Sequence, residues 1–272
     1  MKRLSLSLVA TLAIVNTANA SSLAEAFSNG KVSGELKSQF YQKESNDSKT
    51  VNILTNGLNL SYITADYNGL TGGVTFQTAS VAAKDLDENP AAYDADQNVG
   101  GSVLSQAYIQ YKIDNTTFKA GRQYLSTPLI ASSGSRIFKE SFEAATVTNT
   151  DIKDTSISLM YVDKFQGRTD GNEGAPSFNN LGDGVFSIYA TNKSIANLSL
   201  VGQYVNAKKL LSNNTKDVSI YYLNGEYDFS AFKLGALYYG SDDNGAGNDD
   251  GNAYAVKAST KIEDISLAAS YS

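Results

Sequence analysis

The sequence predicts an all-β fold, a transmembrane antiparallel up-and-down β-barrel, and three observations lead to this prediction. Apolar and polar residues alternate with a period of two over most of the chain after residue 30. Short turns and long polar connections follow one another in alternation, as they do in barrels of outer membranes. After residue 20, no apolar stretch is long enough to cross a bilayer as a helix.

Residues 1–20 have the features of a secretory signal peptide. Lys2 and Arg3 supply a positively charged start, a short apolar stretch follows, and Ala18-Asn19-Ala20 is a small-x-small cleavage site. The apolar stretch is too short to span a bilayer as a helix, which needs about 20 residues. We therefore expect residues 21–272 to be the mature chain and exclude residues 1–20 from the predicted barrel.

The alternation defines about thirteen strands of roughly 9–13 residues, a length that suits a tilted membrane crossing. Before the first strand, Ser22–Asn29 is expected to form a short helical turn on the periplasmic side. The predicted strands are 31–43, 51–67, 70–80, 101–113, 116–123, 142–150, 155–164, 182–192, 197–206, 216–228, 231–240, 252–262 and 265–272.

The connections between these strands differ in length. The short turns are Asn68-Gly69, Asp114-Asn115, Asp151–Asp154, Lys193–Asn197, Asp228–Ala231 and Glu263-Asp264. The long connections are Glu44–Lys49, Val81–Gly100, Tyr124–Ser141, Phe165–Gly182, Ala207–Thr215 and Ser241–Asn252. We expect the short turns to face the periplasm and the long loops to face the outside. Bacterial single-chain barrels have an even number of strands, so we expect a barrel of 16–18 strands that is incomplete at the C-terminus of this sequence.

The composition excludes several classes of function. The chain contains no His and no Cys, which removes Ser-His-Asp triads, thiol nucleophiles and His-ligated zinc. The formal net charge of −6 becomes −8 once Lys2 and Arg3 are removed, and an acidic chain binds nucleic acid poorly. The acidic run Ser241–Gly251 lacks the register of a calcium loop and is expected to be solvated. We therefore predict no enzymatic activity, no metal, no cofactor and no nucleic-acid partner.

The third long loop, residues 121–143, has an unusual composition. It is longer than a hairpin needs, and it contains the apolar residues Leu125, Leu129, Ile130, Ile137, Phe138 and Phe142. A loop in the outer solvent would not need so many apolar side chains. We expect this loop to fold into the barrel lumen, where those side chains would pack against the wall.

The same region resembles a known family. The run Gly121–Ile130, a Ser/Gly patch with Arg136, and Ser141–Ala144 are similar to OprD-type outer-membrane porins, in the branch found in epsilonproteobacteria. The stretch from Ser22 to Gly34 is similar to the mature start of those proteins. The resemblance implies an eighteen-stranded pore that is often trimeric, with the third loop as a constriction. It also implies a ladder of basic residues on one wall, and small carboxylate-bearing solutes such as amino acids and peptides.

Arginine is the side chain best suited to such solutes, because its planar fork binds a carboxylate through two hydrogen bonds. The residues that we expect at the constriction and in contact with solutes are Arg122, Tyr124, Ser133, Ser135, Arg136, Lys139, Glu140 and Glu143. The basic ladder is sparse, and the lysines that could replace it are Lys112, Lys119, Lys233 and Lys257.

A structural role is an alternative for each of these arginines. Arg122 would then pair with a carboxylate and hold the loop, and Arg136 would pair with Glu140 or Glu143. Arg168 lies in a polar loop and is interpreted as solvated surface.

The sequence thus predicts a passive outer-membrane pore for small polar solutes. The expected partners are outer-membrane lipids, lipopolysaccharide and two further copies of the chain in a homotrimer. Two alternatives stay open: a general pore with weak cation preference, and a structural or adhesive barrel whose outer loops bind a partner.

Overall fold

A computed structural model describes residues 3–13, 19–44, 50–86, 97–171, 173–211, 215–243 and 250–272. Residues 45–49, 87–96, 212–214 and 244–249, which belong to four of the predicted long loops, lie outside the described residues. The described elements are α1 (Leu23–Ser28), β1 (Arg3–Ala13), β2 (Lys31–Glu44), β3 (Thr50–Ile63), β4 (Leu70–Leu86), β5 (Gly101–Ile113), β6 (Thr116–Gln123), β7 (Ser141–Asn149), β8 (Thr155–Gln166), β9 (Phe178–Asn192), β10 (Leu198–Leu211), β11 (Lys216–Asp228), β12 (Lys233–Asp242), β13 (Gly251–Ile262) and β14 (Ile265–Tyr271).

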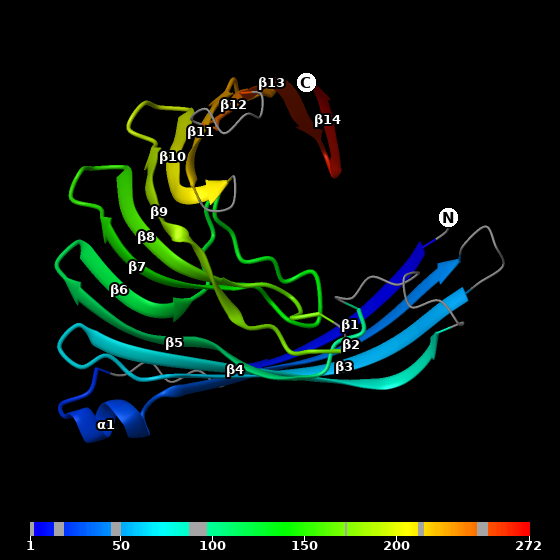
Figure 1. Cartoon of the computed structure of the whole chain (residues 1–272). Helices are drawn as coiled ribbons and strands as arrows, with labels where there is room; N and C mark the ends of the chain where they lie inside the picture. The colour runs from blue at the N-terminus through cyan, green and yellow to red at the C-terminus, as the bar shows by residue number, and fades with distance from the viewer. Residues whose placement is uncertain are drawn as a thin grey trace.

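The strands form a single antiparallel sheet in which each strand lies beside its neighbours in sequence, from β1 to β14. Figure 1 shows that the sheet curves around a hollow, with the N- and C-terminal strands at its two edges. Among the described strands, β1 pairs only with β2 and β14 only with β13, so the sheet is open between them. The prediction of an antiparallel up-and-down barrel fold is confirmed, and thirteen of the strands, β2 to β14, correspond to the thirteen predicted from the sequence.

The short turns contain residues that tolerate the left-handed backbone region. Asn68 and Gly69 both have positive φ, 53° and 85°, which is the conformation of the tight two-residue turn that joins twisted antiparallel strands. Asp114, Asn197 and Glu263 also have positive φ in their turns. These turns lie at one end of the sheet, and the strand ends that lead into the long connections lie at the other.

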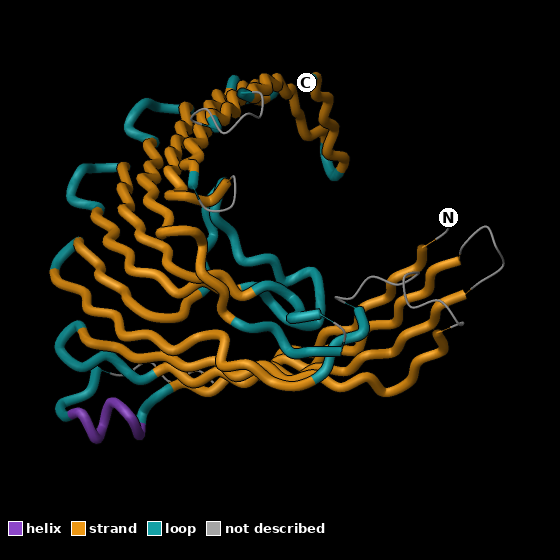
Figure 2. Tube along the Cα trace, in the orientation of Figure 1, coloured by secondary structure: helices purple, strands orange, loops and turns teal. Residues whose placement is uncertain are grey.

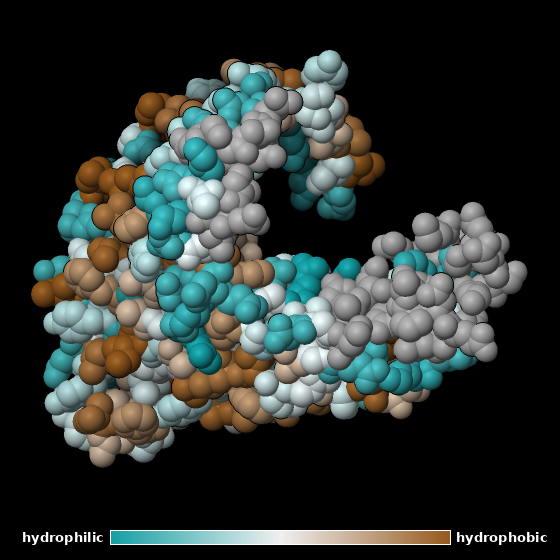
Figure 3. Space-filling model, viewed as in Figure 1, coloured by the Kyte–Doolittle hydropathy of each residue, from teal (hydrophilic) through white to brown (hydrophobic). Residues whose placement is uncertain are grey.

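The two faces of the sheet differ in character. In β4, Val74 and Phe76 are 44% and 43% exposed, whereas the residues between and after them, Thr75 and Gln77, are buried. Figure 3 shows apolar residues over much of the outer side of the curved sheet. An apolar outward face with a polar inward face is the arrangement of a barrel in a membrane. No helix in the described part of the chain is long and apolar enough to span a bilayer.

Strand boundaries differ from the prediction most in β4, and by four or five residues in β3, β9 and β10. Residues 81–86 were assigned to a long loop, but they continue β4 as far as Leu86. Residues 83–86 pair with Val51–Leu54 of β3, and a shift of register separates them from Val81, which pairs with Thr55. The alternation in the sequence breaks at this irregularity, which is why the extension was missed.

The N-terminal segment also differs from the expectation. Arg3–Ala13, which the sequence analysis set apart as part of a signal peptide, forms β1 and pairs with β2 along its whole length. In the sequence, Leu4, Leu6 and Leu8 alternate with serines, so this apolar segment has the period of a strand as well. It covers backbone groups on the edge of β2 that would otherwise lack partners.

Candidate functional site

The connection between β6 and β7, residues 124–140, lies on the concave side of the sheet. Figures 1 and 2 show it crossing the hollow, together with the connection between β8 and β9. Its first half folds back on itself, because Ser126 and Ala131 form a β-bridge and the Ser132 amide donates to the Leu125 carbonyl at 2.8 Å. We call residues 124–140 the crossing segment.

The first half of the crossing segment packs on an apolar part of the inner wall. Leu125 and Ile130 are each 8% exposed and belong to one buried cluster. The wall residues of this cluster come from β7 to β11 and are Phe142, Ala144, Val162, Val185, Val205, Ala207 and Val218. Burial of these side chains holds the first half against the later strands of the sheet.

A buried glutamine adds hydrogen bonds to this apolar packing. Gln203 of β10 is 4% exposed, and its Oε1 accepts a hydrogen bond from the Leu129 amide at 2.9 Å. Its Nε2 donates to Thr127 Oγ1 at 2.9 Å and to Ser187 Oγ at 3.0 Å. The amide therefore satisfies backbone and side-chain groups that would be costly to bury alone.

The second half of the crossing segment packs on the opposite part of the wall. Ile137 and Phe138, 2% and 1% exposed, cluster with Ala79 of β4 and with Val99. Ile137 also lies over Gly57 of β3, where an added Cβ would be only 2.9 Å from Ile137 Cγ2. Close approach of the segment to β3 thus depends on the missing side chain at position 57.

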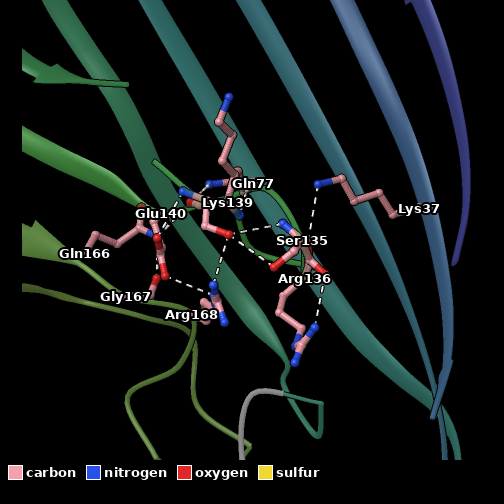
Figure 4. Close-up of polar contacts among 10 residues, drawn as sticks. Lys37, Gln77, Ser135, Arg136, Lys139, Glu140, Gln166, Gly167 and Arg168 are labelled. Carbon is pink, nitrogen blue, oxygen red and sulfur yellow. Dashed lines mark hydrogen bonds and ion pairs between the residues drawn. The ribbon is translucent and has the colours of Figure 1, made fainter. Parts of the chain in front are cut away.

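Another buried glutamine binds the backbone at this end. Gln77 of β4 is fully buried, its Oε1 accepts from the Lys139 amide at 2.8 Å, and its Nε2 donates to the Lys139 carbonyl at 2.9 Å. Gln166, at the end of β8, donates to the same carbonyl at 3.1 Å. Figure 4 shows the two amides converging on Lys139 from different strands.

The middle of the crossing segment contacts β2. Lys37 of β2 is 7% exposed, and its Nζ donates to the Arg136 carbonyl at 3.4 Å. The same ammonium lies 3.4 Å from Glu35 Oε2. The segment therefore reaches from β10 to β2 across the hollow.

An ion pair joins the crossing segment to the neighbouring connection between β8 and β9. Arg168 Nε lies 2.9 Å from Glu140 Oε1, and its Nη2 donates to Ser133 Oγ at 2.9 Å. Glu140 Oε2 accepts from the Ser133 amide at 3.0 Å. The interpretation of Arg168 as solvated surface was wrong, because its side chain is only 28% exposed and holds two residues of the segment.

Tyr124 and Lys139 form a pair at the two ends of the segment. The Lys139 ammonium lies 4.1 Å from the centre of the Tyr124 ring, and the Tyr124 hydroxyl lies 3.0 Å from Ser105 Oγ. Burial lowers the pKa of Lys139, the Lys37 charge lowers it further, and Glu35 opposes both. Burial also raises the pKa of Tyr124, against the effect of its hydrogen bond with Ser105.

Two of the predicted site residues are not part of this group. Arg122 pairs in register with Ala107, on the same face as Ile109, which is 65% exposed on the outer side. Glu143 lies between Phe142 and Ala144, whose side chains both point inward. Arg122 Nε and Glu143 Oε2 are 3.4 Å apart on the outer face. Arg122 thus pairs with a carboxylate, as the structural alternative expected, but neither residue lies with the crossing segment.

Five residues outside the crossing segment contact it and were not among the predicted site residues, and they are Lys37, Gln77, Gln166, Arg168 and Gln203. A usable signal existed for two of them. Gln77 and Gln203 occupy polar positions between apolar residues of predicted strands, so the alternation alone assigns them to the lumen. Their partners could not be predicted, because the path of a loop across a lumen is a tertiary property.

One acidic group has the spacing of a metal site. Carboxylate oxygens of Asp242, Asp243 and Asp250 lie within 4.8 Å of one another where β12 ends and β13 approaches. Exposed acidic side chains often gather in this way without an ion, and the group is remote in sequence from the crossing segment. We assign it no role.

Comparison with solved structures identifies the fold. The chain superimposes on Pseudomonas aeruginosa OccD3 (OpdP) with a TM-score of 0.64 and 17% identity, over 90% of this chain and 57% of that one. For Acinetobacter baumannii OccAB1 the TM-score is 0.64 and the identity 15%, over 89% and 64%. For P. aeruginosa OpdO the values are 0.69 and 12%, over 91% and 65%. The chain therefore spans about three fifths of the length of these proteins, and the likeness concerns the fold alone.

The family of the chain is identified from its sequence. No curated protein sequence matches the chain. The family described as "outer membrane porin, OprD family" matches residues 97–272, which is more than half of the chain and includes the crossing segment. The protein is thus an outer-membrane β-barrel, and it belongs to the OprD family of outer-membrane porins.

Proposed function

We propose that this protein forms a passive pore for small polar solutes and that the crossing segment narrows it. The observation that carries the proposal is the attachment of one segment to both sides of the hollow, through Gln203 on β10 and through Gln77 on β4. A segment held at both ends cannot swing freely out of the lumen, so what passes must pass beside it. Ser133, Ser135 and Arg136, between the two attachments, are then the side chains nearest to a passing solute.

The solute class that we propose is small molecules with a carboxylate group. Lys37, Arg136 and Lys139 bring three cationic groups to the crossing segment, while Glu35 and Glu140 each lie beside a cation. By register, Lys119, Lys233 and Lys257 also lie on the inner face. Lys233 is paired with Glu226 at 3.5 Å and with Asp228 at 3.6 Å, so Lys119 and Lys257 are the additional cations. A cationic lumen attracts anionic solutes, and the nearby carboxylates keep the attraction weak enough for release.

Planar-bilayer recordings of the purified protein test this function. Discrete channels are expected, with anion selectivity that falls in Arg136→Ala and in Lys139→Ala. Arg122→Ala is the matched control, because it removes the same charge from the outer face and should leave selectivity unchanged. Absence of any channel would favour the structural or adhesive alternative. Equal selectivity in all variants would contradict the solute class and leave the pore intact.

We also propose that residues 1–20 are removed on export. The Ala20 side chain is 8% exposed beside Ala26 and Ala65, and its amide donates to the Asp66 carbonyl at 2.8 Å, so a protease would have little access to this bond after folding. Removal would release β1 and free the edge of β2 for pairing with another strand. Mass spectrometry of the protein from outer membranes should give an N-terminus at Ser21, and an N-terminus within residues 1–18 would contradict the proposal.

Lipids of the outer membrane, with lipopolysaccharide on the side of the long loops, are the partners that we propose for the outward face. A homotrimer is the assembly that we propose, by analogy with the family. Chemical cross-linking in native membranes tests it, and a monomer alone would contradict it.

A further inference from the structure

The helix α1 is built by a local sequence signal. Ser22 is its N-cap and accepts a hydrogen bond from the Glu25 amide at 3.1 Å. Glu25 in turn accepts from the Ser21 amide at 2.7 Å, so the two residues act as a capping pair. A helix of six residues is not stable in water by itself, so contacts with the sheet must hold it.

These contacts fix one side of α1 to the end of β3. Ala26 is 2% exposed and packs against Ala65, whose amide donates to the Ala26 carbonyl at 2.9 Å. This contact stays after removal of residues 1–20, whereas the contact of Ala26 with Ala20 does not. The Tyr62 hydroxyl donates to the Phe27 carbonyl. The Tyr62 ring lies against Gly30, where an added Cβ would clash with the phenol oxygen. The helix therefore has a defined position relative to the strands.

The remaining apolar side chains of α1 are exposed. Leu23 and Phe27 lie one turn apart, on the same side of the helix, and are 54% and 57% exposed. Figure 3 shows apolar residues gathered at the lower left of the molecule, where Figure 1 places α1. Two large apolar side chains on so short a helix are unusual for a segment that faces only water.

Phe27 lines one end of a groove on the outer side of the sheet. The groove has a volume of about 470 Å³, and Phe27 lines it together with Tyr62, Val74, Ala107, Ile109 and Ala120. Val74 and Ile109 belong to the outward apolar face, at 44% and 65% exposure. The exposed side of α1 is thus continuous with the surface that faces the membrane.

The position of the groove along the strands indicates its depth. Val74 is four residues from the start of β4 at Leu70, which is about 13 Å along a strand. With the tilt of barrel strands, this is about 10 Å along the membrane normal. The polar layer of a bilayer is only about 5–7 Å thick on each side. A groove that begins at the helix and extends this far passes from the interface into the hydrocarbon.

We propose that α1 anchors the barrel in the inner leaflet of the outer membrane, with Leu23 and Phe27 inserted and a phospholipid acyl chain in the groove beside Phe27. The inner leaflet follows from the position of α1 at the end of the short turns, which face the periplasm in bacterial barrels. Short amphipathic segments bind interfaces through such apolar side chains. The anchor sets the depth of the barrel and does not depend on what the pore transports.

The chain contains no Trp, which allows a direct experiment. The variant Phe27→Trp carries a single Trp and is reconstituted as the full chain in vesicles of phospholipid brominated on the upper part of the acyl chains. Ser28→Trp, at the exposed neighbouring position, is the matched control, and Ile109→Trp is the reference for a lipid-facing strand. We expect bromine to reduce the fluorescence of Phe27→Trp and Ile109→Trp by about twofold or more, and that of Ser28→Trp much less.

Two results would overturn the proposal. Quenching of Phe27→Trp by aqueous acrylamide to the level of Ser28→Trp, without quenching by bromine, would place the side chain in water. Protection of Phe27→Trp from both quenchers would indicate a protein contact, such as a second copy of this chain. Leu23→Ser together with Phe27→Ser, introduced into the Ile109→Trp variant, is expected to weaken its bromine quenching while single-channel conductance stays unchanged. Failure of the anchor is therefore distinguishable from failure of the pore.

Discussion

The two halves of the crossing segment are attached to the wall by different means. The first half buries Leu125 and Ile130 in an apolar cluster that extends over five strands. The second half buries Ile137 and Phe138 in a smaller apolar cluster and adds polar contacts at its end, in which Gln77 binds the backbone of Lys139 and Arg168 binds Glu140. Apolar packing is strong and tolerant of direction, whereas amide hydrogen bonds fix a position. We infer that the first half provides most of the stability and that the second half sets the width of the pore.

The largest effect on this comparison is expected from Ile130→Ala. Truncation of a buried aliphatic side chain lowers the free energy of unfolding by about 2–5 kcal/mol, and Ile130 belongs to the apolar cluster that holds the first half. Denaturant midpoints of the folded barrel should fall accordingly. The control is Ile188→Ala, since Ile188 is 45% exposed on the outer face. Equal losses in both variants would mean that the cluster does not hold the segment.

Gln77→Leu should have a smaller effect on stability and a clearer effect on the pore. It leaves the amide and the carbonyl of Lys139 without this partner, at a cost of about 1–3 kcal/mol. Since the second half would then move, we expect higher and noisier single-channel conductance. Gln110→Leu, on the inner face near the short-turn end, is the control. An unchanged conductance in Gln77→Leu would refute the assignment of pore width to this half.

The charge of Lys139, in the second half of the crossing segment, should make anion selectivity depend on pH. Because burial lowers its pKa, Lys139 should lose its proton at a lower pH than exposed lysines do. Anion selectivity should therefore decline as the pH rises through this lowered pKa, and it should be fully present below it. Lys139→Arg, which stays charged, should remove the decline. The measurement is the reversal potential in a salt gradient over the alkaline range, and a decline that persists in Lys139→Arg would have another origin.

The smallest effect is expected from Glu140→Gln. The pair with Arg168 is partly exposed, at 16% and 28%, so its contribution is about 1 kcal/mol or less and is screened by salt. Channel noise should rise slightly at low ionic strength and be normal at high ionic strength. A large effect at all salt concentrations would show that the ion pair, rather than Gln77, positions the second half.

Much of this architecture follows from the sequence, because the period of two is local. The bounds of β5, β6 and β11 agree with the prediction residue by residue. The extension of β4 was missed because a shift of register breaks the alternation there. Arg168 was misjudged because its partner, Glu140, lies on another connection.

The candidate site was less predictable than the fold. Tyr124, Ser133, Ser135, Arg136, Lys139 and Glu140 are on the crossing segment, as their position in the sequence implies. Arg122 and Glu143 belong to strands, and by the alternation of side chains along those strands both point outward. The face on which each residue lies could have been counted from the sequence. The contacts of Gln77 and Lys37 with the crossing segment could not, because they depend on how the sheet curves.

The most direct test of the account uses the absence of Cys from the chain. A single Ser135→Cys variant is treated with a charged methanethiosulfonate reagent during single-channel recording, and labelling is verified by mass. If the crossing segment narrows the pore, conductance should fall in one step per channel, and the same treatment of Ser194→Cys, in a short turn, should change nothing. A fully labelled Ser135→Cys channel with unchanged conductance would contradict the account.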